Sequence, residues 1–202
     1  MGKTACFIGQ FETRENAEPG IIEGRAIVFN QRTDLGFFDE IIAPEALDGA
    51  DLRDVRLCLN HDTSFVYART RNNNENSTMR LSIDENGMNI RAVLDVLNSP
   101  QAQSYYSAVS RGDIDKMSFM FIVDREEWED LESDHPTRII RGIERVFEVS
   151  AVTFPAYEGT AIKTRAMSEA MESAKDSLEN ARATARELER QKQRIRILTE
   201  VL

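Results

Sequence analysis

The chain has 202 residues, a formal net charge of −10 and a mean hydropathy of −0.43. That length is enough for one domain with a sizeable core plus an appendage. Because phosphate groups bind basic faces, the negative charge excludes a typical nucleic-acid-binding protein, and we expect no nucleic-acid partner. Seven basic and seven acidic residues follow position 167, so the acidic excess lies in the part before it.

Few residues are suited to metal or disulfide chemistry. The two cysteines, Cys6 and Cys58, are too few for a disulfide framework, and Cys58 is typical of a small core residue. His61 and His135 are the only histidines and no Cys-x-x-Cys motif occurs, so we expect no metal and no cofactor. No apolar run could span a bilayer and the first residues do not read as a secretory signal, so we expect a soluble, intracellular protein without membrane contacts.

The chain begins with a pattern typical of short β-strands separated by turns. Strands are predicted over Ala5–Phe11 and Ile21–Phe29, on either side of a Pro19-Gly20 turn. A short apolar run, Phe38–Ile42, precedes a predicted single helical turn over Ala43–Leu47, which has proline near its start.

The strand pattern continues through the middle of the chain. Further strands are predicted over Arg56–Leu59 and Phe65–Arg71, the second of which runs into an asparagine-rich loop. Two more, Thr78–Ile83 and Met88–Val96, flank Asp84–Gly87, whose Asn-Gly step is a strong hairpin signal.

A helix is predicted next, followed by the last strands. Ser99 is a suitable N-cap, Pro100 suits the first helical position, and Gly112 would end the helix. A strand over Met117–Val123 then leads into a predicted acidic loop, Glu126–Pro136.

Strands over Arg138–Ile140 and Ile143–Val152 complete this part. The pattern predicts a mostly β, α+β domain over residues 1–166, as a closed or nearly closed β-barrel with one or two helices.

Residues 167–202 form a separate helical segment in this interpretation. Glycine and proline disappear there, and a heptad seam follows alternating steps of three and four: Met171, Ala174, Leu178, Ala181, Ala185, Leu188, Lys192, Ile195, Thr199 and Leu202. Such a helix could pack on its own domain. We favour a self-associating or partner-binding arm, because no breaker interrupts the pattern.

Three residues able to act in catalysis lie within runs that otherwise predict buried strands. Ser118, His61 and Glu148 would each be costly to bury alone, so pairing among them is favoured. A serine hydroxyl needs a base in order to attack a carbonyl, and the base needs a group that orients it. We therefore predict a serine hydrolase with nucleophile Ser118, base His61 and orienting acid Glu148.

Several alternatives stay open. Ser118 and His61 could be structural residues, and Glu148 could pair with an arginine such as Arg145 or Arg141. A Ser/Lys dyad is a mechanistic rival, because Lys116 lies two residues before Ser118 and shares its strand face.

Two further features bear on the type of hydrolase. No Gly-x-Ser-x-Gly motif occurs, which argues against an α/β-hydrolase. The turn Phe154–Tyr157, directly after the Glu148 strand, is where we expect oxyanion-hole donors.

These segments resemble the prohead (capsid maturation) proteases of tailed bacteriophages from about Phe11 to Ala166. The resemblance is carried by Gly24–Asn30, Asp34–Leu47, Leu59–Asp62, Lys116–Phe119 and Phe147–Tyr157, in that order. That family is similar in fold to the herpesvirus assemblins, serine proteases built on a seven-stranded β-barrel with peripheral helices. The assemblins have a second histidine as third catalytic member, where the phage relatives have an acidic residue.

The resemblance implies the same catalytic set, Ser118, His61 and Glu148. It also implies a role: cleavage of scaffold protein or of an extension of the major capsid protein inside the immature capsid. That capsid would lie in the cytoplasm of an infected bacterium, or the protein would be encoded by a prophage. Self-cleavage and a homodimer or higher homo-oligomer are expected by the same analogy. The helical arm over 167–202 would be a scaffolding segment or one removed by self-cleavage.

Two rivals from other functional classes are a non-enzymatic capsid-assembly protein that acts through its C-terminal helix and a plain β-barrel binding module.

Overall fold

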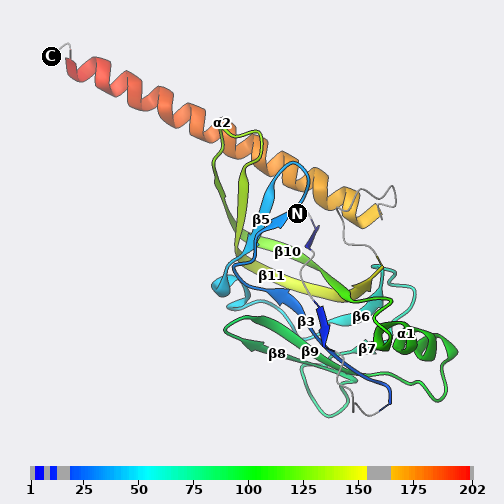
Figure 1. The fold of residues 1–202 in the computed structure, drawn as a ribbon. Helices are drawn as coiled ribbons and strands as arrows, with labels where there is room; N and C mark the ends of the chain where they lie inside the picture. The colour runs from blue at the N-terminus through cyan, green and yellow to red at the C-terminus, as the bar shows by residue number, and fades with distance from the viewer. Residues whose placement is uncertain (1–2, 7–9, 13–18, 154–164, 201–202) are drawn as a thin grey trace.

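The computed structural model describes residues 3–6, 10–12, 19–153 and 165–200. The strands are β1 (Lys3–Cys6), β2 (Gln10–Glu12), β3 (Ile21–Val28), β4 (Thr33–Asp34), β5 (Asp39–Ile42), β6 (Arg56–Leu59), β7 (Ala68–Arg69), β8 (Met79–Asp84), β9 (Gly87–Val93), β10 (Lys116–Glu129) and β11 (Thr137–Val152). The helices are a 3-10 turn, η1 (Pro44–Leu47), and the α-helices α1 (Pro100–Ser110) and α2 (Arg165–Glu200). The fold is therefore α+β and mostly strands, as predicted, with a long C-terminal helix (Figure 1).

The strands join in one hydrogen-bonded sheet in the order β4-β5-β11-β10-β2-β3-β9-β8. β1 pairs with β10, and β6 pairs with β11 and with β7. Among the described residues these pairings give a path with two ends, at β4 and β8. Strands from both ends still contribute to one apolar core, because Ile42 of β5 and Met79 of β8 belong to the same buried cluster.

β10 and β11 form a long antiparallel hairpin at the centre of the sheet (Figure 1). The predicted acidic loop from Glu126 was wrong at its start, because β10 continues to Glu129. Carboxylates there are held across the ladder: Glu126 accepts a hydrogen bond from Nε of Arg138 at 2.7 Å, and Glu127 accepts one from Nε of Arg141 at 3.1 Å. Opposite charges across a strand pair stabilise it, so the acidic residues extend the hairpin.

The predicted helix α1 is confirmed in its capping. The Ser99 hydroxyl accepts a hydrogen bond from the Ala102 N–H at 3.2 Å, and Pro100 occupies the first turn. Tyr105 and Val109 share the buried face with Ala102. α1 therefore packs its apolar side onto the main core.

The β8–β9 hairpin is also confirmed, but its glycine has a different role from the one expected. The loop is Glu85-Asn86, and Gly87 is the first residue of β9, paired with Asp84. Gly87 has φ +148, and a Cβ at this position would lie 1.9 Å from the carbonyl oxygen of Ile27. Glycine is required there by close approach of the β3 backbone.

α2 has a docked half and a projecting half (Figure 1). Ala170, Ala174 and Leu178 are buried, and Ala174 packs in a small cluster with Leu35 and Phe38. The same seam then leaves the domain, and Leu188 and Ile195 are 51% and 64% exposed. Packing on its own domain therefore describes the first part of the helix, and the self-associating or partner-binding arm stays a prediction for the rest. No helix in the described ranges is long and apolar enough to cross a membrane.

Candidate active site

His61 lies in a tight turn at the end of β6. The Asp62 N–H donates a hydrogen bond to the Leu59 carbonyl at 2.9 Å, and the two central residues, Asn60 and His61, have φ of 51° and 61°. Positive φ at both centres is the signature of a type I′ turn, in which asparagine is common. A histidine at positive φ is unusual, and such backbone persists only where the surroundings enforce it.

Asn60 is the residue that fixes this turn to β11. Its side-chain oxygen accepts a hydrogen bond from the Thr153 N–H at 2.8 Å, and its amide donates to the Thr153 hydroxyl at 2.9 Å. The Asn60 N–H donates to the Ala151 carbonyl at 2.8 Å, which extends the parallel β6–β11 pairing by one residue. The direction in which His61 leaves β6 is therefore set by the end of β11.

Glu148 of β11 receives the imidazole of His61. Its Oε1 lies 2.5 Å from His61 Nδ1, and the two side chains are 2% and 1% exposed. A carboxylate accepts hydrogen bonds, so Nδ1 carries the proton in this pair. In the neutral ring Nε2 is then the basic nitrogen.

Ser150 completes the support of this pair, a role that the sequence analysis missed. Its hydroxyl donates a short hydrogen bond to Oε2 of Glu148, and its Oγ accepts one from the backbone N–H of His61 at 3.1 Å. Strand alternation puts Ser150 on the face of Glu148, two residues earlier, which is the signal that could have identified it. One buried serine thus holds both the carboxylate and the backbone of the histidine.

Ser118 of β10 is fully buried and lies directly opposite Ser150 in the antiparallel ladder. Directly opposed residues point to the same face, with Cβ atoms about 4.5–5.5 Å apart. The ladder is regular from Lys116 to Met120 and becomes irregular only beyond that point. The structure therefore joins His61 and Glu148 by a hydrogen bond, and the register sets Ser118 opposite Ser150, the serine that contacts both.

The alternative partners considered for these residues are engaged elsewhere. Arg145 lies over the Phe147 ring and near Asp51, and Arg141 pairs with Glu45 and Glu127. Glu148 is thus held by His61 rather than by either arginine.

Lys116, the rival base, has its Nζ 3.0 Å from a carboxylate oxygen of Asp115, with a side chain 39% exposed. A hydrated, ion-paired lysine is unlike the desolvated lysine that a dyad needs.

The neighbours of the site show how dry it is. Burial raises the pKa of the Cys58 thiol to about 12, and the negative charge of Glu148 adds to the effect. Burial also raises the pKa of Tyr105 well above its ordinary value. Electrostatic interactions are stronger in such a poorly solvated region. The predicted oxyanion turn, Phe154–Tyr157, lies outside the described residues.

His135, the other histidine, contacts none of the three proposed catalytic residues in the hydrogen bonds and ion pairs described. It lies 3.1 Å from Asp39 and 3.7 Å from Asp34, at the opposite end of β11. Within the part of the chain that the structure describes, these three residues are the group that could hold a metal. Asp39 also binds Arg32 at 2.8 Å, so ion pairs account for its surroundings.

A comparison with models of protein families places this geometry in context. Residues 9–176 match the model described as caudovirus prohead serine protease. Searches of curated proteins and of solved structures gave no significant match. The match covers every strand that carries the site, and it agrees with the resemblance carried by the sequence motifs.

Proposed function

Because the chain belongs to the caudovirus prohead serine protease family, we propose that it is a serine endopeptidase of capsid maturation, with Ser118 as nucleophile, His61 as base and Glu148 as orienting acid. The observation that carries the assignment is the buried hydrogen bond between His61 Nδ1 and Glu148, with Ser118 across the ladder from the serine that supports both. The family supports a protease role; the residues are our assignment.

In the proposed reaction, His61 Nε2 takes the hydroxyl proton of Ser118 as Oγ bonds to the scissile carbonyl carbon. The carbonyl oxygen becomes an oxyanion, and the new imidazolium is stabilised by the carboxylate of Glu148. The intermediate then collapses with cleavage of the C–N bond, and His61 returns the proton to the leaving amine. Water activated by the same imidazole hydrolyses the acyl-enzyme and regenerates Ser118.

We propose major capsid protein, scaffold protein or both as substrates, with self-cleavage as a further activity, inside the immature capsid within the bacterial cytoplasm. An assemblin-like closed barrel is part of the same proposal. The single core shared by strands from both ends of the sheet supports it.

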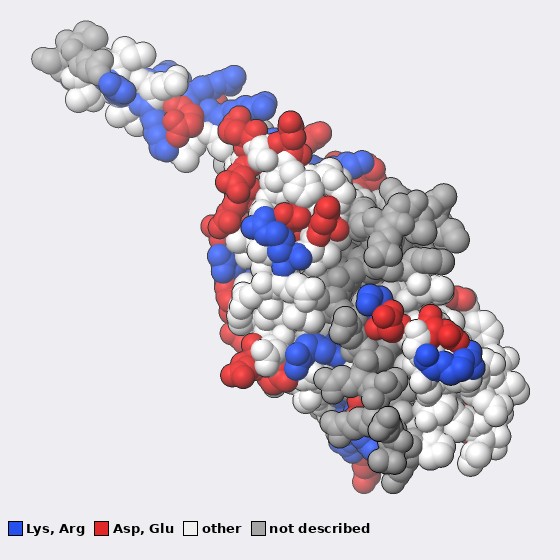
Figure 2. Space-filling view, in the orientation of Figure 1, with Lys and Arg blue, Asp and Glu red and all other residues white. Residues whose placement is uncertain are grey.

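A second candidate function, assembly through the helical arm, is favoured by the projecting half of α2. Every residue from Arg186 to Thr199 is exposed, including the apolar Leu188, Ile195 and Leu198. Figure 2 shows basic side chains along this half and acidic side chains along the neighbouring edge of the domain. Such a helix could bind a partner helix or a second copy in a homodimer, as an activity additional to proteolysis.

Wild type and Ser118→Ala, expressed alone and together with the cognate capsid protein, would separate these functions. Intact mass spectrometry would monitor truncation of the chain and of the capsid protein. We expect truncation with the wild-type protein and none with Ser118→Ala. His61→Ala should abolish it and Lys116→Ala should not, because Lys116 is solvated and ion-paired. Function that survives Ser118→Ala and is lost only on removal of residues 183–202 would instead support the assembly protein.

A further inference from the structure

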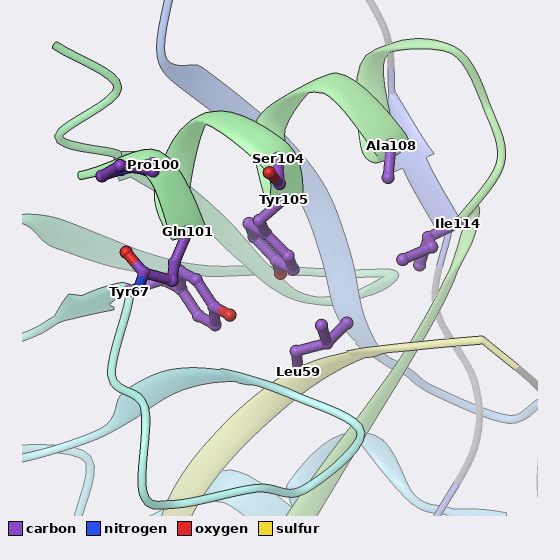
Figure 3. A pocket seen from close by; sticks show the side chains of 8 residues that line it. All are labelled: Leu59, Tyr67, Pro100, Gln101, Ser104, Tyr105, Ala108 and Ile114. Atoms are coloured by element: carbon purple, nitrogen blue, oxygen red, sulfur yellow. The ribbon is translucent and has the colours of Figure 1, made fainter.

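An apolar pocket of about 390 Å³ opens between α1 and the end of β6 (Figure 3). Its lining includes Leu59, Tyr67, Tyr105, Ala108 and Ile114, and none of the described residues that line it is charged. A pocket of this volume lies within the range of about 300–1,000 Å³ found for ligand sites. Nothing in the proposed catalytic step uses it.

Two residues that line the pocket lie close in sequence to the proposed base and nucleophile. Leu59 precedes His61 by two residues, and Ile114 precedes Ser118 by four. An extended residue spans at most about 3.3–3.6 Å, so these lining residues lie within about 7 Å and about 14 Å of the proposed base and nucleophile. A substrate bound in extended form advances by the same length, so a side chain within four residues of the scissile bond is within reach of the pocket if the substrate follows the end of β6 around the sheet.

The floor of the pocket is rigidly connected to the site. The rings of Tyr67 and Tyr105 stack with their centroids 4.5 Å apart. The Tyr105 hydroxyl points to the Cys58 carbonyl at 3.5 Å, and Cys58 pairs in register with Ser150. A side chain bound against these rings would therefore fix a substrate relative to the strands that carry the chemistry.

The lining also defines the chemistry of the occupant. Two aromatic rings and the aliphatic Leu59, Ala108 and Ile114 favour a large apolar group, since burying apolar area gains about 25 cal/mol per Å². A charged side chain would find no charged partner among the described lining residues and would lose its hydration. We infer that this pocket is a substrate subsite that binds one large apolar side chain, such as Leu, Met or Phe, of the polypeptide being cleaved. This inference rests on the proposed function.

The test fills the pocket from α1 and reads the specificity of cleavage. Ala108→Trp projects an indole into it, whereas Gln103→Trp puts the same group on an exposed position of α1 that does not line it. Each full-length variant digests a library of proteome-derived peptides, and cleavage positions are mapped by mass spectrometry. A small fluorophosphonate, which needs no subsite, labels Ser118 in parallel.

We expect wild type and Gln103→Trp to prefer a large apolar residue at one position within four of the cleaved bond. Ala108→Trp should replace that preference by Gly, Ala or Ser and lower kcat/KM for the best wild-type peptide at least about tenfold, with fluorophosphonate labelling unchanged. Ser104→Trp, at an exposed lining position one turn earlier, serves as the second variant if Ala108→Trp fails to fold.

Cleavage by wild type without an apolar preference, or an unchanged profile in the filled variants, would overturn the subsite and leave the protease intact. Wild type that neither cleaves nor takes the label, alone or with the capsid protein, would overturn the proposed function and the subsite with it.

Discussion

Ser150 donates its hydroxyl hydrogen to one oxygen of Glu148, the carboxylate whose other oxygen holds His61. The same serine accepts the backbone N–H of His61 at 3.1 Å. Neither contact places Ser150 on a reacting atom in the proposed reaction. It is a positioning residue, because it fixes the carboxylate and the histidine relative to each other.

Ser150→Ala should therefore slow the reaction without abolishing it. A hydrogen bond to a charged group is worth about 1.5–3 kcal/mol, which corresponds to about 10–150-fold in rate. The loss should fall on kcat rather than on KM, because Ser150 would position the base and not the substrate. The measurement is steady-state cleavage of a peptide selected from wild-type digests.

Two variants control this prediction. Ser82→Ala removes an exposed strand hydroxyl and should leave kcat unchanged, and Ser150→Thr keeps the hydroxyl and should recover much of the rate. A Ser150→Ala enzyme with wild-type kcat would refute the positioning role.

Glu148→Gln should be more damaging than Ser150→Ala. The amide keeps the shape but loses the charge, and its NH₂ can donate to Nδ1 and so impose the wrong tautomer on His61. In the Ser-His-Asp template the corresponding change lowers kcat by about 10⁴-fold, and we expect a loss of that order here. The rate of fluorophosphonate labelling at Ser118 measures it.

Glu144→Gln is the matched control, since Glu144 is an exposed acid on the same strand. Its labelling rate should equal that of wild type. If Glu148→Gln kept more than about a tenth of the wild-type rate, the third catalytic member would have to be sought elsewhere.

The local features of the fold could be predicted from sequence, and the long-range ones could not. Ser99 and Pro100 predicted the start of α1, because helix capping depends only on neighbours a few residues away in the chain. The extension of β10 to Glu129 was missed, because it depends on arginines that approach only once the hairpin has formed.

The candidate site divides in the same way. Polar side chains in apolar strands identified Ser118, His61 and Glu148, since burial without partners is costly. The parallel pairing of β6 with β11 could not be predicted, because it joins residues about ninety positions apart in the chain. Strand alternation predicts only the face of the sheet on which each side chain lies. The positive φ of His61 was not predicted, because glycine and asparagine are the usual signals of a left-handed turn and histidine is a weaker one.

Cys58 should be inert to alkylation in the folded protein. The thiolate is the reactive form, and burial, with the charge of Glu148, raises the pKa of this thiol from 9.0 to about 12. Iodoacetamide at pH 8 should therefore leave Cys58 unmodified in native protein and modify it in urea, as read by peptide mass spectrometry. Rapid labelling in native buffer would show that the strand pairing beneath the site opens.

The buried ion cluster under α2 should matter far more to stability than its exposed counterpart on the same strand. Arg138 is 2% exposed and bridges Glu40 and Glu126, and Glu126 in turn accepts a hydrogen bond from Ser177 of α2. Arg138→Met keeps the volume but leaves the buried carboxylate of Glu40 and the partly buried one of Glu126 without this cation, so urea denaturation should show a loss of about 3–5 kcal/mol. Arg141 is 40% exposed and has two carboxylate partners, and Arg141→Met should leave the urea midpoint close to that of wild type, because exposed ion pairs contribute little to stability.

Adding Glu40→Met to Arg138→Met distinguishes charge from packing. Removing the buried acid together with its cation should restore part of the stability, because an apolar replacement of a buried ion pair is often neutral. A double variant less stable than Arg138→Met would mean that the cluster acts through packing and hydrogen-bond geometry rather than through balanced charge. In either case we expect the docking of α2 to be weakened together with the hairpin. Ser177 of α2 donates its hydroxyl hydrogen to Glu126 and accepts the indole N–H of Trp128, so it depends on the position of both side chains.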